Sequence, residues 1–368
     1  MAHLADVDGI QLAPGASAIA EMVGSSDHLV FVLADGLGMH QVEAMDGCAF
    51  IPGHLAAEVC AVFPSTTPVA LTSLATGEWP NVHGAIGWNV YLPEIHVVAE
   101  IIRFFRRRDQ VSLDRLGLTP EDVYPVPSAF SRTDRDVVSF LPEAIAGSPY
   151  SVYAVGGAPN RGYRTLSQAV DAVLQRVATA DGPTFTNLYW PNVDTVSHAL
   201  GTEHAHVRAA VRELDREIAR LHAGLSRRGR IVLSADHGLV DTAEDQVHVL
   251  EPSDELIGCL TKEPSGEDRA VDFSVAVEKE ARFRDLFKRR FGERFLLLAT
   301  DEVQALELFG PGLLSVVARR RLGNLVAIST GADVLLFPWT GPPSKDPPAV
   351  SRHSGLNPAE IRVPLMLA

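Results

Sequence analysis

Aspartate and histidine side chains of the kind that bind metal ions occur in four separate segments of the chain. They are Asp35, Asp194, His198, Asp236, His237 and His353. Carboxylates and imidazoles together form the mixed oxygen and nitrogen ligand set that suits zinc and that manganese or iron also accepts. With one hydroxyl oxygen added, these groups suffice for two sites of three or four ligands each. The sequence therefore predicts two divalent metal ions, with Zn²⁺ as the first choice.

Taken singly, most of these residues have an ordinary structural explanation. An aspartate that ends an apolar run before a glycine, as Asp35 does, is as typical of a turn as of a metal site. His353 taken alone reads as a surface loop residue. Asp194 and His198 are four positions apart, so on a helix they share one face and can reach one ion.

Asp236 and His237 follow an apolar run and precede Gly238. Neighbouring side chains on a regular strand point to opposite faces, but a glycine turn at the strand end lets both reach one side. A simple turn explains the aspartate but not the imidazole beside it, so this pair favours metal binding.

The candidate nucleophile is Thr67, which precedes Pro68. Residues Val69–Thr76 read as a short helix, so we expect Thr67 at its N-cap and Pro68 at its first position. Plain capping is one explanation of the threonine. The same position would place a nucleophile at the positive end of a helix, which favours an alkoxide and a bound phosphate. Ser65 and Thr66 precede the expected cap and are weaker candidates.

Apolar runs that end in polar clusters must position these groups. They are His28–Ala34, Ala57–Phe63, Tyr150–Val155, Thr184–Trp190 and Arg230–Ala235. Continuous apolar runs are typical of strands buried on both faces of a parallel sheet. Ligands bind at the carboxyl ends of such strands, so we expect an α/β fold in which the polar clusters converge.

Helices are expected between these strands and in a later, different segment. The segments Leu166–Ala178 and Glu203–Ser226 are amphipathic, and the second carries an apolar stripe at alternating steps of four and three. From about Pro252 to Ala327 the polar clusters stop. There we expect an inserted cap subdomain, residues 252–327, on a core of residues 1–251 and 328–368. Within and after the cap we expect a helix at Glu278–Arg290, a strand at Phe295–Ala299, a loop at Gly341–Ser351 and a last strand at Arg362–Ala368.

Composition narrows the class of protein. The 368 residues include 32 basic and 46 acidic side chains, a net charge of −14, which argues against binding a nucleic-acid duplex. The three cysteines form no CxxC pair, and no apolar run approaches the ~18 residues of a membrane span. The N-terminus has no signal-peptide pattern. We therefore expect a reduced, cytoplasmic protein with no membrane segment; the sequence is silent on its oligomeric state.

In order along the chain, the motifs resemble the type I phosphodiesterase/nucleotide pyrophosphatase family of the alkaline phosphatase superfamily. The resemblance runs from residue 30 to residue 355. Its features are Ala34-Asp35-Gly36, Phe63 to Thr67, Thr76-Gly77, His83-Gly84, Tyr189 with Asp194 and His198, Ser234 to Gly238, and His353-Ser354-Gly355. Each motif is weak alone, but the ordered set is specific.

The resemblance implies a fold, a ligand partition and a reaction. The fold is an α/β/α sandwich with a mainly parallel central sheet and an inserted cap. One metal would be bound by Asp194, His198 and His353, and the other by Asp35, Asp236, His237 and the Thr67 hydroxyl. The expected reaction is hydrolysis of phosphodiester or pyrophosphate bonds in a small-molecule phosphate ester, through a phospho-threonine intermediate.

The sequence departs from the family pattern at two places that affect substrate choice. Nucleotide-cleaving members follow the nucleophile with an aromatic residue that holds a base, whereas Pro68 stands here. The asparagine that holds a phosphate oxygen in those members falls on Trp88 or on Asn89, and Asn89 is our candidate. Trp88, Tyr91 and Trp190 lie near predicted site loops, as pocket aromatics or as core. We expect small or aryl phosphodiesters rather than nucleotides.

Other readings of the same motifs stay open to different degrees. A phosphonoacetate-type or phosphomonoester hydrolase could use the same ligands and threonine. A sulfatase would need a Cys/Ser-x-Pro-x-Arg motif, which the segment from Pro64 to Pro68 does not match. A phosphomutase would use serine and a richer ligand set. A non-catalytic, metal-stabilised binding protein would be expected to lack a ligand or the nucleophile, and none is missing.

Overall fold

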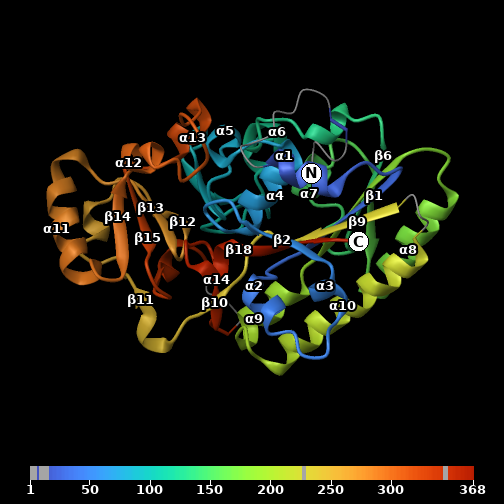
Figure 1. Cartoon of the computed structure of the whole chain (residues 1–368). Helices are drawn as coiled ribbons and strands as arrows, with labels where there is room; N and C mark the ends of the chain where they lie inside the picture. The colour runs from blue at the N-terminus through green and yellow to red at the C-terminus, as the bar shows by residue number, and fades with distance from the viewer. Residues whose placement is uncertain (1–5, 8–15, 226–228, 343–346) are drawn as a thin grey trace.

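The computed structural model describes residues 6–7, 16–225, 229–342 and 347–368, and it contains two seven-stranded sheets with helices around them (Figure 1). The central sheet has the strand order β2-β18-β9-β1-β8-β6-β7. Its strands are β1 (His28–Ala34), β2 (Leu55–Cys60), β6 (Asp136–Pro142), β7 (Asn160–Tyr163), β8 (Thr184–Trp190), β9 (Gly229–Ser234) and β18 (Arg362–Leu367). β1 runs parallel to β8 and β9, and β18 is antiparallel to β9 and β2. The expected α/β fold with a mainly parallel central sheet is confirmed.

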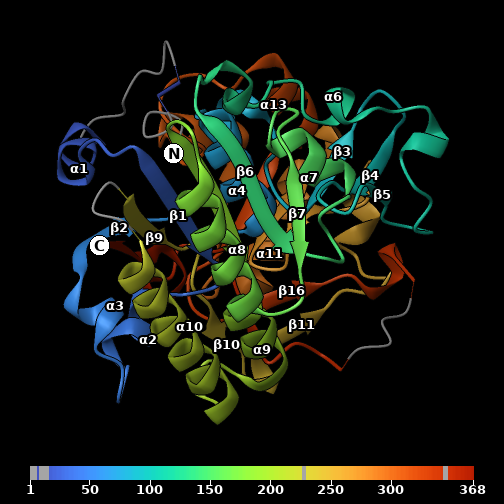
Figure 2. The ribbon, with the colours of Figure 1, turned by 90° about the vertical axis from the view of Figure 1, so that its right-hand side faces the viewer.

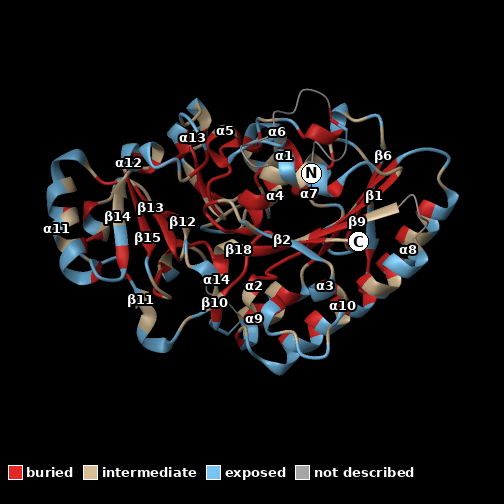
Figure 3. Cartoon of the chain, in the orientation of Figure 1, coloured by how far each residue is buried: buried red, intermediate tan, exposed pale blue. Residues whose placement is uncertain are grey.

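Both faces of the central sheet are covered by helices. Val30 and Val32 of β1 pack with α8 (Leu166–Thr179) and α10 (Ala205–Gly224), whereas Phe31 and Leu33 pack on the other face. On that face lie α1 (Ala16–Val23), α4 (Thr67–Thr76) and α7 (Pro149–Ala154) (Figure 2). Figure 3 shows the buried residues concentrated in the sheet and on the inner sides of these helices. Both predicted amphipathic helices are confirmed, although Ser226 lies outside the described residues.

One predicted strand is wrong. The run Tyr150–Val155 lies in helix α7, because Ser148 accepts a hydrogen bond from the Ser151 backbone N–H at 3.1 Å and Pro149 begins the helix. The strand in this part of the sheet is β6, which the apolar runs did not indicate. The predicted run Ala57–Phe63 corresponds to β2, which lies at the sheet edge and is largely exposed.

The second sheet has the order β14-β15-β13-β12-β3-β4-β5. Its strands are β3 (Asn89–Leu92), β4 (Val97–Glu100), β5 (Phe105–Arg106), β12 (Ser265–Glu267), β13 (Ala270–Phe273), β14 (Phe295–Ala299) and β15 (Leu325–Ser329). Helix α11 (Glu280–Phe291) packs on it, as expected for that segment. Strands from residues 89–106 complete this sheet, and β15 crosses the expected boundary at 327. The division into a core and a cap at 252–327 therefore stays a prediction.

Shorter helices and strands complete the fold. They include α2 (Met39–Glu43), α3 (Phe50–Gly53), α5 (Pro80–His83), α6 (Pro120–Val123), α9 (Asn192–Leu200), α12 (Thr300–Ala305), α13 (Val316–Arg321), α14 (Pro358–Ile361), β10 (Val240–Asp241), β11 (Val247–Val249), β16 (Val334–Leu336) and β17 (Ser351–Arg352). Part of the expected loop at 341–351, residues 343–346, lies outside the described residues. None of the helices in the described part of the chain is long and apolar enough to cross a membrane.

Candidate metal centre

The predicted ligands meet at the carboxyl ends of adjacent central strands. Leu33 of β1 is in register with Tyr189 of β8 and Ser234 of β9, so the three strands end side by side. Asp35 follows β1, helix α9 with Asp194 and His198 follows β8, and Asp236 and His237 follow β9. His353 follows β17 and is buried, not the surface residue that its position alone suggested.

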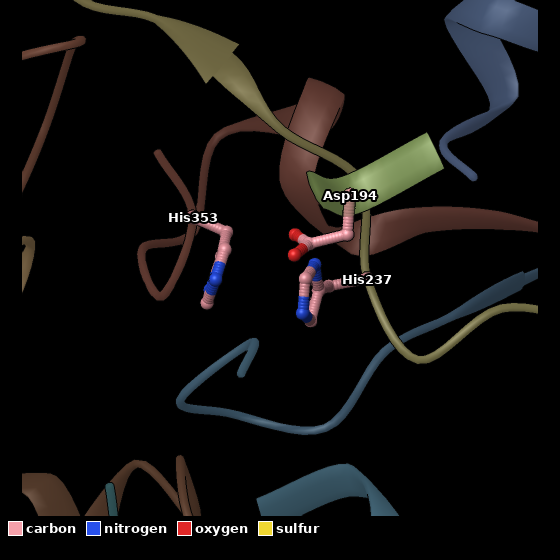
Figure 4. A group of neighbouring side chains, drawn as sticks. All are labelled: Asp194, His237 and His353. Atoms are coloured by element: carbon pink, nitrogen blue, oxygen red, sulfur yellow. The ribbon is translucent and has the colours of Figure 1, made fainter. Parts of the chain in front are cut away.

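The candidate ligand atoms form two groups that share one histidine. Among the described residues, ligand atoms of Asp35, Asp236 and His237 lie within 4.8 Å of one another, as do those of Asp194, His237 and His353. Figure 4 shows the second group converging from separate segments. His198 belongs to neither group, although its Nε2 lies 3.2 Å from Asp194 Oδ1. The geometry thus sets His237 between the two predicted ligand sets.

The Asp35–Gly36 pair has a clear structural reason. Gly36 has φ +73°, and a Cβ there would lie 2.7 Å from the Cα of Asp194. Only glycine adopts this conformation readily and leaves room for the helix. The Asp194 backbone N–H also donates to the Asp35 carbonyl at 3.0 Å. This close approach brings the start of α9 against the end of β1.

Each buried carboxylate has one oxygen fixed by the fold and one left over. Asp236 Oδ1 accepts from the backbone N–H groups of Gly36 at 3.2 Å and His237 at 3.1 Å. Asp35 Oδ2 accepts from the Tyr189 hydroxyl. Within the described part of the chain, Asp35 Oδ1, Asp194 Oδ1 and Asp236 Oδ2 are buried without a hydrogen-bond partner. Buried oxygens of this kind are costly unless a cation meets them, so they fit metal ions.

All three histidines are oriented by backbone carbonyls. Nδ1 lies 2.7 Å from the Ser351 carbonyl in His198, 3.0 Å from the Ser65 carbonyl in His353, and 3.1 Å from the Gly238 carbonyl in His237. When Nδ1 carries the proton that these contacts require, Nε2 keeps its lone pair for a metal. In that tautomer each imidazole can ligate through Nε2.

Electrostatics point the same way. Burial, followed by the charges of Asp236 and Asp194, raises the pKa of Asp35 well above its usual value, and burial also raises the pKa of Asp236. Burial, with His237 and His198 nearby, lowers the pKa of His353. The crowded buried carboxylates call for positive charge beside them, and bound divalent ions are one source of it.

Thr67 lies inside the centre, one residue later in the helix than expected. The N-cap of α4 is Thr66, so Thr67 is the first helical residue and the expected N-cap was wrong by one position. The Thr67 side chain is therefore not used for capping. Its hydroxyl lies 3.2 Å from His237 Nε2.

The sequence analysis did not indicate Glu267, a residue of the second sheet that contacts the loop before Thr67. The Thr66 hydroxyl donates to Glu267 Oε1, and the Trp88 backbone N–H donates to the same oxygen at 3.1 Å. Burial raises the pKa of Glu267 to about 8. Glu267 and Thr66 are some 200 residues apart, and no motif near Glu267 indicates the contact.

The four residues considered for substrate contacts occupy different environments. The Asn89 amide donates to the Gly266 carbonyl at 3.3 Å, whereas Trp88 lines a cavity that also contacts Thr67. Tyr91 lies under Lys262, whose Nζ is 3.9 Å from the ring centroid. Trp190 is 2% exposed and belongs to the core.

Comparison with known proteins agrees with this geometry. A family model described as type I phosphodiesterase / nucleotide pyrophosphatase matches residues 29–257. No curated protein matches the sequence. The solved structures of murine and human ectonucleotide pyrophosphatase/phosphodiesterase 5 are similar, with TM-scores of 0.68 and 0.67 and identities of 15% and 13%, each over 92% of this chain and 87% of theirs.

Two further structures extend the comparison. Phosphonoacetate hydrolase from Sinorhizobium meliloti, in complex with phosphonoformate, has a TM-score of 0.66 and 16% identity over 94% of this chain and 90% of that one. An inactive variant of the murine protein is described in complex with AMP. At these identities the likeness to solved structures establishes the fold.

Proposed function

The chain belongs to the type I phosphodiesterase/nucleotide pyrophosphatase family, and on that basis we propose that it is a metal-dependent hydrolase of phosphodiester or pyrophosphate bonds that acts through a phospho-threonine on Thr67. The observation that carries the proposal is the convergence of the Thr67 hydroxyl with unpartnered carboxylate oxygens. That hydroxyl lies 3.2 Å from His237 Nε2, and Asp35 Oδ1 lies 3.6 Å from the same nitrogen.

In this proposal two divalent ions, first of all Zn²⁺, are held by the six predicted ligands and the Thr67 hydroxyl; Mn²⁺ or iron suits the same donors. One set is Asp35, Asp236, His237 and Thr67. The other is Asp194, His198 and His353, with His237 near enough to belong to either. When bound, such ions lower the pKa of a coordinated hydroxyl and offset charge that develops on phosphate oxygens.

The chain's own groups would perform the remaining steps. The Thr67 oxygen would attack phosphorus and form a P–O bond while the P–O bond to the leaving group breaks, and the proton lost from Thr67 would leave with the departing alcohol. Water would then cleave the phospho-threonine, with its OH going to phosphorus and its other proton restoring the Thr67 hydroxyl. Free N–H groups at the start of α4 favour phosphate there. We also propose that Asn89 contacts a phosphate oxygen, which requires its amide to leave Gly266.

Phosphonoacetate and phosphomonoesters are the alternative substrates of such a centre. Phosphonoacetate carries a carboxylate that calls for a cationic partner. Arg103 is the one basic side chain among the described residues lining the cavity at Thr67, and it already pairs with Glu100 at 2.9 Å. This pairing favours ester substrates.

Turnover of a p-nitrophenyl phosphodiester by metal-loaded protein tests the proposal. We expect Thr67→Ala to keep its fold and to lose several orders of magnitude in kcat, because the nucleophile is gone. Thr179→Ala, which removes an exposed threonine hydroxyl of α8, is the control and should retain the wild-type activity. Near wild-type turnover in Thr67→Ala, or loss only in Thr66→Ala, would contradict the assignment.

A further inference from the structure

A cavity of about 440 Å³ extends from the metal centre between the central sheet and the helices above it. Asp35, Thr67 and Asp194 form its wall at the centre. Away from the centre it runs between strands β1, β6 and β8 on one side and helices α4 and α7 on the other. A phosphate at Thr67 would therefore have its organic group directed toward this cavity.

The wall beyond the metal centre is mainly aliphatic. Its aliphatic residues include Leu33, Leu71, Leu74, Ile102, Leu141 and Ala144. Leu71 and Leu74 lie four and seven residues after Thr67, so they share its face of helix α4. Apolar side chains that are only half-buried and that line a cavity gain free energy when an apolar ligand excludes water from them.

The polar side chains in this wall are largely engaged with protein groups. Asn187 Nδ2 donates to Ser139 Oγ at 2.8 Å, and Ser148 Oγ donates to Ser151 Oγ at 2.9 Å. Arg103 at the rim pairs with Glu100. These contacts use part of the hydrogen-bonding capacity that a nucleobase or a second phosphate would need, whereas a hydrocarbon needs none of it.

We propose, resting on the hydrolase function above, that this cavity binds an aliphatic chain of the substrate. The substrate class is accordingly a phosphate ester or diester with an alkyl chain rather than a nucleotide. The aromatic side chains of Trp88, Phe105, Phe130, Tyr150 and Tyr189 also contribute to the wall.

A homologous series of substrates tests this inference. The probes are p-nitrophenyl phosphodiesters whose second ester is methyl, butyl or octyl, with the p-nitrophenyl ester of thymidine 5′-monophosphate as the nucleotide. Each buried methylene contributes roughly threefold to fourfold in kcat/KM, so octyl should exceed methyl by about a hundredfold when about four of its added methylenes are buried. Equal rates for methyl and octyl, or a preference for the nucleotide ester over octyl, overturn the inference.

Variants assign the effect to the cavity. Ala144→Trp adds bulk at an exposed position of the wall, so the octyl-to-methyl ratio should fall about tenfold or more. Ala178→Trp, on the exposed side of α8, is the matched control and should keep the wild-type ratio. A ratio unchanged by Ala144→Trp overturns the assignment.

A binding measurement separates this inference from the proposed function. Calorimetry should show octylphosphonate binding to metal-loaded protein at least tenfold more tightly than methylphosphonate, whether or not any ester turns over. Tight octylphosphonate binding without turnover of any ester would contradict the hydrolase function and leave the chain site standing. Equal binding of the two phosphonates contradicts the chain site.

Discussion

Asp35, Asp236 and His237 show how single residues are prepared for a cation. One oxygen of each carboxylate is fixed by the Tyr189 hydroxyl or by backbone N–H groups, and the other is buried without a partner in the described part of the chain. The imidazole is anchored through Nδ1. Such orientation by neighbouring groups reduces the reorganisation needed on binding.

At the same scale, Glu267 is expected to act as a positioning residue. Its Oε1 accepts from the Thr66 hydroxyl and the Trp88 N–H, so Glu267→Ala should loosen the loop before Thr67 and lower kcat by about tenfold to a hundredfold. Glu267→Gln keeps an acceptor at that position and resembles the neutral acid that a pKa of about 8 favours at pH 7. It should stay within about threefold of wild type.

Kinetics at pH 7, with metal content measured on the same samples, check this prediction. Glu278→Ala, which removes an exposed glutamate, is the control and should not change kcat. Equal losses in Glu267→Ala and Glu267→Gln would show that charge rather than hydrogen-bond acceptance matters.

His353 is expected to hold one of the two ions. Elemental analysis of carefully purified protein should find close to two equivalents of transition metal, and His353→Ala should lose about one of them because a ligand is gone. His206→Ala removes an exposed histidine and should lose none. If His353→Ala keeps both equivalents, or if wild type at full occupancy holds one, the two-site assignment is wrong.

Among the elements, the loop that carries His353 depends on a buried ion pair. Arg269, in the turn between β12 and β13, contacts Glu360 of α14 at 2.7 and 2.8 Å, and both side chains are fully buried. Glu360 also accepts from the backbone N–H of Gly355 at 2.8 Å and Asn357 at 3.1 Å. The second sheet thereby braces the segment that follows His353.

Removing one partner of this pair should be strongly destabilising. Glu360→Ala leaves a buried guanidinium uncompensated, so we expect it to lower the free energy of unfolding by about 3–5 kcal/mol. Glu58→Ala breaks the exposed pair with Arg362 and should change it far less, because solvent screens an exposed pair. Denaturant unfolding of the two variants measures both values, and similar effects would contradict the role given to the buried pair.

The elements also show what the sequence could and could not reveal. Strands β1, β8 and β9 were recognisable because each is buried on both faces and reads as a continuous apolar run. The run Tyr150–Val155 is equally apolar, but the N-cap at Ser148 and the proline at position 149 start a helix there. β2 was recognised despite its exposed edge position.

Contacts between distant segments could not be predicted from the sequence. The ligand residues could be predicted because family motifs carry them, whereas Glu267 and the Arg269–Glu360 pair arise from packing of the second sheet against the core. Strands β3 to β5 join that sheet through antiparallel pairing of β3 with β12, which lies about 170 residues later in the chain. The sequence contains no signal for the register of such a distant pairing.

For the whole molecule, stability should depend on metal and pH together. Burial raises the pKa values of Asp35 and Asp236 in the folded protein above those in the unfolded chain. Without metal, these two groups therefore contribute fully to stability below the ordinary aspartate pKa, and that contribution is lost as the pH rises through the raised pKa values. These two carboxylates should therefore lower the Tm of metal-free protein as the pH rises above about 4, whereas the lowered pKa of His353 acts in the opposite sense, and added Zn²⁺ should restore more at neutral pH. A free ion concentration of a thousand times the Kd adds about 4 kcal/mol to the free energy of unfolding.

Thermal unfolding with chelator and with Zn²⁺, at several pH values, measures this coupling. Asp35→Asn with Asp236→Asn removes the titrating groups and should flatten the pH dependence of the metal-free form. A Zn²⁺ effect on Tm that is the same at pH 4 and pH 7 would contradict the linkage.

In the proposed reaction, Thr67 becomes covalently bound to phosphorus. Metal-loaded protein mixed briefly with excess p-nitrophenyl octyl phosphodiester, quenched in acid and digested, measures it directly by mass spectrometry of the peptides. We predict that the peptide spanning the start of α4 carries the octyl phosphoryl group, with fragmentation placing it on Thr67 and no adduct in Thr67→Ala. An adduct on Thr66 or another residue, or turnover without any adduct at saturating substrate, would contradict the account.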